Sequence, residues 1–132
     1  GDLPSGLRLF DGTQQTRAYV DASVPRAAYE GRPGVVCVRL DFGRDILPQL
    51  LDDLYGLSVQ SLLVEGGREL LQSFIDAGLW DEVFIERTPR ILGQGVPAPE
   101  MGASACFRGI TRFQSDYLHY FRRAEWSVDE MC

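Results

Sequence analysis

The residues best placed to do chemistry lie at one turn, Glu65-Gly66-Gly67, between an apolar run at 62–64 and a helical pattern that starts at Arg68. The first N–H groups of a helix have no intrahelical acceptor, and they carry the positive end of the helix dipole. Glycine has no Cβ, so a phosphate group can approach such donors closely. Ligands of open α/β sheets bind at the carboxyl ends of strands, where Glu65 would stand. The turn therefore predicts a site for a phosphate-bearing ligand with a carboxylate beside it.

Two simpler interpretations of this turn remain open. The glycine pair can serve only the geometry of a tight strand-to-helix turn, and Glu65 can be an ordinary solvated carboxylate. The turn is not a GxGxxG fingerprint, and no phosphate-binding lysine follows it, since the chain contains no lysine. A second segment, 89–97, is rich in proline and glycine and has no helix after it. It is either a structured loop or a loop that closes over a ligand.

Hydrophobic spacing predicts the elements that position these residues. Strands and helices alternate along the first two thirds of the chain, which is typical of an α/β sheet with helices on its faces. Asp45 is the predicted N-cap of the middle helix, and Gly56 and Gly78 are predicted to end the middle and last helices. The expected strands are 16–20, 35–40, 61–65 and 82–88, the expected helices lie near 25–30, 46–54 and 70–78, and strands 105–111 and 117–123 form a final antiparallel hairpin.

Composition narrows the classes of partner. The formal net charge is −6, and every cationic side chain apart from His119 is an arginine. No basic cluster stands out, which argues against nucleic acid and anionic membranes as main partners. No apolar run approaches the roughly 20 residues of a membrane span, and no leader pattern opens the chain, so we expect a cytoplasmic protein. Cysteines 37, 106 and 132 are far apart and predict no metal site, and Asp52-Asp53 is interpreted as a solvated helix face.

Several motifs together resemble a known family. Val64-Glu65-Gly66-Gly67, then Ala-Gly-Leu-Trp-Asp-Glu at 77–82 and Leu-Gly-Gln-Gly at 92–95, resemble the reductase domain of the bifunctional riboflavin-biosynthesis deaminase/reductase. The stretch 7–12 also fits, and the resemblance extends from about residue 7 to residue 123. It implies a dihydrofolate-reductase-like α/β fold with three layers, α/β/α, and a mostly parallel mixed sheet that ends in an antiparallel hairpin.

The resemblance also implies a reaction. NADPH would give a hydride to the ribose carbon of 5-amino-6-(5-phosphoribosylamino)uracil, and the product would carry a ribitylamino chain. The carboxylate of Glu65 would face this phosphoribosylaminopyrimidine substrate. The cofactor would lie along the second glycine and the next turns of helix, mostly through backbone contacts, and the residues so assigned are Gly66, Gly67, Arg68, Glu69, Leu70, Leu71, Gln72 and Ser73.

One departure from the family pattern shapes the expected domain organisation. The family's reductase domain opens with a strand, a Ser-Leu-Asp-Gly-like segment and further cofactor-binding residues, and this chain has no counterpart to them. We therefore expect residues 1–123 to be part of a reductase domain with little turnover alone, and residues 124–132 to be a tail. Two rival hypotheses remain: another dihydrofolate-reductase-like reductase, or a non-catalytic assembly module. In the second, a hairpin carrying Tyr117, Tyr120 and Phe121 would pair with another subunit, as in a homodimer.

Overall fold

A computed structural model describes residues 3–4, 6–25, 27, 30–91 and 93–124 of the chain. The chain divides into two compact units, Gly1–Leu62 and Leu63–Cys132. Each unit is described here by itself. In the described part of the chain, no helix combines the length and the apolar character needed to cross a membrane.

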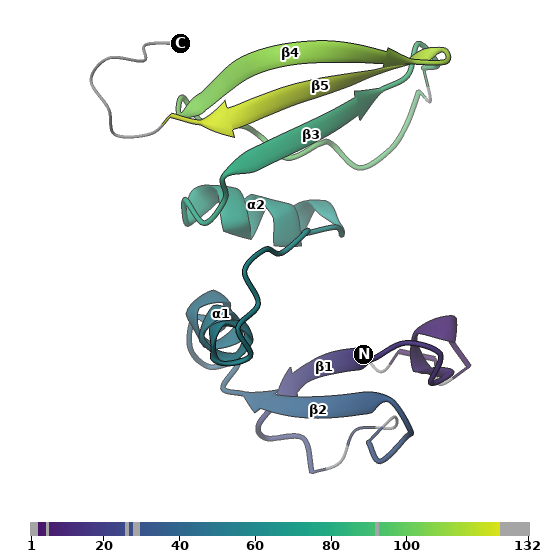
Figure 1. The fold of residues 1–132 in the computed structure, drawn as a ribbon, viewed down its shortest axis with the longest axis vertical. Helices are drawn as coiled ribbons and strands as arrows, with labels where there is room; N and C mark the ends of the chain where they lie inside the picture. Colours follow the sequence, from purple (N-terminus) through teal and green to yellow (C-terminus); the bar gives the residue numbers. More distant parts are fainter. Residues whose placement is uncertain (1–2, 5, 26, 28–29, 92, 125–132) are drawn as a thin grey trace. The chain divides into compact units, whose positions relative to one another are not determined.

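The first unit contains a parallel pair of strands and one α-helix (Figure 1). A short 3-10 helix, Arg8–Phe10, precedes β1 (Thr16–Asp21), which pairs in parallel with β2 (Val35–Leu40). Helix α1 (Ile46–Gly56) follows β2 directly. Both strands and α1 were predicted, and the parallel pairing agrees with the nearly continuous apolar run in β2. The buried apolar residues of this unit are Phe10, Val20, Ala27, Leu40 and Leu47.

Helix α1 begins where its N-cap residue predicts. The side chain of Asp45 accepts a hydrogen bond from the N–H of Leu47 at 3.1 Å, which satisfies a donor that the helix cannot pair internally. The helix ends at Gly56, as predicted. The start and the end of α1 are therefore encoded locally.

The second unit contains one helix and a three-stranded antiparallel sheet (Figure 1). Helix α2 (Arg68–Asp76) precedes β3 (Glu82–Arg87), and β4 (Ala105–Phe113) and β5 (Asp116–Arg123) form the predicted hairpin. The strand order is β3-β5-β4, so β5 lies in the middle. The predicted α/β class is confirmed, and the described strands form two sheets, a parallel one of β1 and β2 and an antiparallel one of β3, β5 and β4.

Two predicted elements are absent among the described residues. Residues 61–65 adopt no strand, and Leu63 is 78% exposed. A strand requires ladder hydrogen bonds to a neighbour, and this segment lies at the boundary between the two units, where no described strand pairs with it. Its apolar character alone cannot provide a partner.

The brief helix predicted near 25–30 is also wrong for its described residues, because Pro25, Ala27 and Glu30 are not helical. Arg39 of β2 donates to the carbonyl of Pro25 at 3.1 Å and to the carboxylate of Glu30 at 3.1 Å. The carbonyl that would begin a helical ladder is thus bonded to a side chain from another element. Residues 26, 28 and 29 lie outside the described part of the chain, as do residues 125–132 of the predicted tail.

Candidate functional site

The turn before α2 leaves backbone donors without an acceptor among the described residues. Gly67 is the N-cap residue in an extended conformation, with φ −68° and ψ 163°, and it has no side chain to cap the helix. The N–H of Leu71 donates to the carbonyl of Gly67 at 3.3 Å and starts the intrahelical ladder. The N–H groups of Arg68, Glu69 and Leu70 therefore precede that ladder, and no capping side chain in the described chain meets them. These donors are suited to an anion.

The two glycines of the turn have different roles. A Cβ on Gly66 would lie 3.1 Å from Cδ2 of Leu70, so the first glycine lets the turn pack closely against the helix. A Cβ on Gly67 would meet no atom within 4 Å. Close packing therefore accounts for Gly66 but not for Gly67, which faces open space at the helix N-terminus. This open space is what a ligand approaching the donors would need.

Glu65 stands immediately before these glycines, at the end of an extended segment. Its side chain is exposed and forms no hydrogen bond or ion pair with any described residue. The carboxylate is therefore available to a ligand that approaches the turn. The same exposure is also that of an ordinary solvated carboxylate, so its predicted contact with substrate stays a prediction.

The outer face of α2 forms a shallow hollow of about 280 Å³. It is lined by Arg68, Glu69, Gln72, Ser73 and Asp76, so four of the residues predicted to bind a cofactor share one surface. Leu70 and Leu71 do not line it, and Leu70 packs over Gly66 instead. The hydroxyl of Ser73 donates to the carbonyl of Glu69 at 2.8 Å, which occupies that hydroxyl within the helix.

The polar contacts found between α2 and the described residues of the loop 89–102 are made by Glu100. The N–H of Glu100 donates to Oε1 of Gln72 at 2.8 Å, and the Glu100 carboxylate lies 3.7 Å from the guanidinium of Arg68. Farther back along the loop, Ile91 is 94% exposed and Val96 is 81% exposed. These polar contacts with α2 thus come from Glu100, which lies outside the segment 89–97 singled out in the sequence. Leu92 of that segment is not among the described residues.

A side-chain cluster in the first unit escaped prediction. Asp53 accepts hydrogen bonds from Nε of Arg17 at 2.5 Å, from Nη2 of Arg17 at 2.7 Å and from the hydroxyl of Tyr19 at 2.8 Å. The interpretation of Asp53 as a solvated residue is therefore wrong, whereas its neighbour Asp52 is exposed. Hydrogen bonds from Arg17, followed by that from Tyr19, lower the pKa of the Asp53 carboxyl, and desolvation opposes them. Arg17 and Tyr19 lie two residues apart on one strand face, and that spacing was the available signal.

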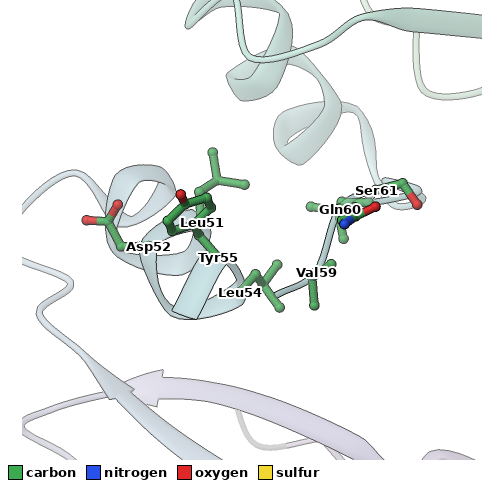
Figure 2. A pocket seen from close by; sticks show the side chains of 8 residues that line it. Leu51, Asp52, Leu54, Tyr55, Val59, Gln60 and Ser61 are labelled. Atoms are coloured by element: carbon green, nitrogen blue, oxygen red, sulfur yellow. The ribbon is translucent and has the colours of Figure 1, made fainter. Parts of the chain in front are cut away.

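A second hollow, of about 360 Å³, lies between α1 and the segment after it (Figure 2). No residue assigned to substrate or cofactor lines it. Its lining residues are Leu51, Asp52, Leu54, Tyr55, Val59, Gln60, Ser61 and Leu62. The predicted site and this hollow therefore belong to different units, and each is considered alone.

Comparison with known families shows to which family the chain belongs. The family model described as RibD C-terminal domain matches residues 8–118. This chain belongs to the RibD C-terminal domain family. The match covers the uncapped turn, α2 and most of the hairpin, in agreement with the resemblance found in the motifs.

Curated relatives and solved structures agree with this membership. The riboflavin biosynthesis protein RibD of Aquifex aeolicus is 34% identical over 56 residues, which are 42% of this chain and 16% of that protein. The protein of the same name from Corynebacterium ammoniagenes is 28% identical, over 71% of this chain and 32% of that protein. The chain thus spans a third or less of the length of these relatives.

The fold is shared with two solved structures of similar proteins. RibD of Acinetobacter baumannii matches with a TM-score of 0.72 and 19% identity, over 93% of this chain and 35% of that one. A Thermotoga maritima protein, a diaminohydroxyphosphoribosylaminopyrimidine deaminase/5-amino-6-(5-phosphoribosylamino)uracil reductase, matches with a TM-score of 0.66 and 20% identity, over 88% of this chain and 33% of that one. The fold class predicted from the sequence, dihydrofolate-reductase-like α/β, is confirmed by these matches.

Proposed function

We propose that this chain is part of an NADPH-dependent reductase of riboflavin biosynthesis, which converts the ribose of 5-amino-6-(5-phosphoribosylamino)uracil to the ribitylamino product. Family membership and the activity named for the Thermotoga maritima protein support this proposal. The single observation that carries it is the N-terminus of α2, where backbone donors without a cap lie beside a glycine that faces open space.

The residues of this turn fit an anionic cofactor through their backbone. The N–H groups of Arg68, Glu69 and Leu70 would donate to a phosphate group of NADPH, with the helix dipole adding to the attraction. Glu65 and Glu69 bring negative side chains to the same turn, so the fit depends on the backbone donors and not on net side-chain charge. A Cβ on Gly67 would meet no described atom within 4 Å, which leaves room at this glycine for the phosphate.

The remaining roles are part of the same proposal and are supported by the family membership. When bound, NADPH supplies the hydride, and the protein holds the two ligands in contact orientation. We assign the rest of the cofactor contact to the stretch from Gly66 to Ser73, and contact with a substrate hydroxyl to the carboxylate of Glu65. The protein would work in the cytoplasm as a homodimer, with neither nucleic acid nor membrane as a partner. Because the chain spans a third or less of the length of its curated relatives, the complete reaction is proposed for a protein of their length.

The competing enzyme hypothesis is a dihydrofolate-reductase-like reductase with another substrate, because one fold can serve many reactions. A panel of carbonyl and ribosyl substrates distinguishes the two. Oxidation of NADPH with the phosphoribosylaminopyrimidine, and not with dihydrofolate, is the result expected of the proposed function.

The direct test has two stages. First, NADPH is titrated into the chain and binding is measured by isothermal titration calorimetry. Second, the chain is joined to the preceding reductase segment of the Corynebacterium ammoniagenes protein, and the loss of NADPH absorbance is followed with the pyrimidine substrate. Binding in the first stage and turnover only in the second are expected. Absence of NADPH binding in both forms would overturn the proposal.

A further inference from the structure

We infer that Gln72 is a positioning residue that holds the segment 93–102 against α2. It thereby fixes the position of Glu100 beside Arg68, at the helix N-terminus where the cofactor is proposed to bind. The inference concerns the same site and rests on the proposed function for its ligand. It assigns to the Gln72 side chain a role within the protein, in place of direct contact with the cofactor.

The carboxamide of Gln72 binds the main chain of Glu100 at both of its polar groups. Its Oε1 accepts from the N–H of Glu100 at 2.8 Å, and its Nε2 donates to the carbonyl of Glu100 at 3.3 Å. The same Nε2 donates to Oδ1 of Asp76 at 2.8 Å. A primary amide offers two donor hydrogens and one acceptor oxygen, and all of these groups are used here. Little hydrogen-bonding capacity is left for a ligand.

The segment that Gln72 holds has few other means of attachment. Pro97 and Pro99 have no backbone N–H, so the segment cannot form a regular ladder. No backbone–backbone hydrogen bond involves residues 93–101 in the described chain. The polar contacts found there, from Gln72 and Arg68, all reach Glu100. Loss of the Gln72 carboxamide would therefore free this segment.

The held residue also adjoins the N-terminus of α2. Arg68, Gln72 and Asp76 recur every four residues and so share one face of the helix. The Glu100 carboxylate lies 3.7 Å from the guanidinium of Arg68, and the N–H of Arg68 is one of the donors without a cap. Gln72 thus sets the place of a negative charge beside the first residue of α2. Displacement of Glu100 would move its negative charge away from the N-terminus of α2 and would give an arriving phosphate easier access to the N–H donors there.

The chain contains a matched control for this contact. Gln49 of α1 accepts from the N–H of Asp41 at 2.9 Å and donates to the carbonyl of Asp41 at 3.0 Å, which is the same pairing in the other unit. No residue of the proposed site takes part in it. The variants Gln72→Met and Gln49→Met remove the carboxamide from each helix while keeping the length of the side chain.

The first measurement is hydrogen exchange of the full chain, followed by mass spectrometry. In Gln72→Met we expect the amide of Glu100, resolved in overlapping peptides within 93–102, to exchange roughly tenfold faster, because its N–H loses its acceptor, Oε1 of Gln72. Gln49→Met should leave those peptides unchanged and quicken exchange around Asp41. Unchanged exchange over 93–102 in Gln72→Met would overturn the inference.

The second measurement is NADPH affinity by calorimetry. Gln72→Met should tighten NADPH binding roughly threefold to tenfold, because the freed Glu100 carboxylate no longer lies beside Arg68 where the phosphate is proposed to bind, whereas Gln49→Met should bind like the unaltered chain. A freed loop with unchanged affinity would overturn the positioning role and leave the proposed function standing. No NADPH binding by the unaltered chain would overturn the proposed function, and with it the role of Gln72 toward the cofactor.

Discussion

Gly67 and Asp45 occupy the same position on two helices of this chain, yet they differ in chemistry. Asp45 satisfies the N-terminus of α1 with its own carboxylate, whereas Gly67 leaves the N-terminus of α2 unsatisfied. An N-cap side chain usually stabilises a helix by about 1 kcal/mol compared with alanine, and glycine gives up a few tenths compared with the best caps. The chain thus leaves a small stabilisation unused at the one helix where the open donors have a proposed ligand.

Replacement of Gly67 by aspartate separates stability from binding. The new carboxylate can accept from the free N–H groups of α2. Gly67→Asp should therefore keep the unfolding free energy or raise it by a few tenths of a kcal/mol, and the melting temperature should be equal or slightly higher. The same carboxylate would occupy and repel the phosphate position, so NADPH binding should fall at least about 100-fold, since a charge-assisted hydrogen-bonding site is lost.

The neutral cap Gly67→Ser is the control for that change. Serine can cap α2 without adding charge, so it should weaken NADPH binding less than aspartate does. Thermal melts and calorimetric titrations of both variants measure the two effects. Full NADPH affinity in Gly67→Asp would show that the phosphate does not bind at this turn.

Asp53 gives the first unit a contribution to stability that depends on pH. Because Arg17 and Tyr19 lower the pKa of Asp53 in the folded state, the carboxylate stabilises the fold fully above its unfolded pKa of about 3.9. That contribution is lost as the pH falls through the depressed folded pKa. Asp53→Asn should therefore be less stable than the unaltered chain at pH about 7, and the difference should shrink toward pH about 2.

Urea unfolding of both forms across this pH range measures the effect. Asp52→Asn is the control, because Asp52 is the exposed neighbour on the same helix. An equal response of the two variants would mean that the bonds from Arg17 and Tyr19 contribute nothing specific to the stability of the first unit.

At the scale of elements, α1 and the β4–β5 hairpin were predictable because their signals are local. A cap, a four-residue periodicity and a terminating glycine lie within the helix itself, and a short turn links the two strands of the hairpin. Gly78 follows the C-cap of α2 and has the left-handed conformation, with φ +65°, so the end of α2 is also marked by a local signal. The segment 61–65 could not be predicted equally well, because a strand depends on a neighbour supplied by another part of the chain.

The cap of α1 gives a prediction at this scale. Asp45→Ala removes the hydrogen bond to the N–H of Leu47 and should lower the unfolding free energy by about 1 kcal/mol, a typical cost of losing an N-cap side chain. Asp45→Asn, which can still accept that bond, should retain most of the stability. Urea denaturation of the two variants decides the matter, and equal losses in both would show that the bond to Leu47 is not what stabilises this end of α1.

For the whole molecule, the question of self-association rests on the aromatic side chains that the sheet of the second unit carries on both of its faces. Phe107 packs edge-on against Phe121 with ring centroids 5.5 Å apart, whereas Phe84 stacks on Tyr120 with centroids 5.0 Å apart. Tyr120 and Phe121 are adjacent in β5, so the two aromatic pairs lie on opposite faces. Phe107 and Ile110 are 52% and 54% exposed, respectively, and their partners in β5, Phe121 and His119, share one face. We propose that this face forms the contact of a homodimer.

Sedimentation velocity tests the homodimer. The chain should sediment as a concentration-dependent dimer, and the double variant Phe107→Ser with Ile110→Ser should shift it toward monomer because apolar contact area is lost. Phe84→Ser probes the opposite face, where Phe84 is equally exposed at 54%, and should leave the dimer intact if the face of Phe107 forms the contact. Each run is repeated with NADPH, which the dimer should bind. A dimer that neither binds nor responds to NADPH would favour the non-catalytic assembly module instead.

The sequence by itself determined the α/β class, both helices, the hairpin and the Glu65-Gly66-Gly67 turn, because each depends on residues only a few positions apart. Only the tertiary structure decided that Asp53 binds Arg17, that Gln72 binds Glu100, and that 61–65 pairs with no strand among the described residues. These outcomes join residues far apart in the chain. No local sequence pattern predicts such a contact, because the contact depends on which surfaces the folded elements bring together.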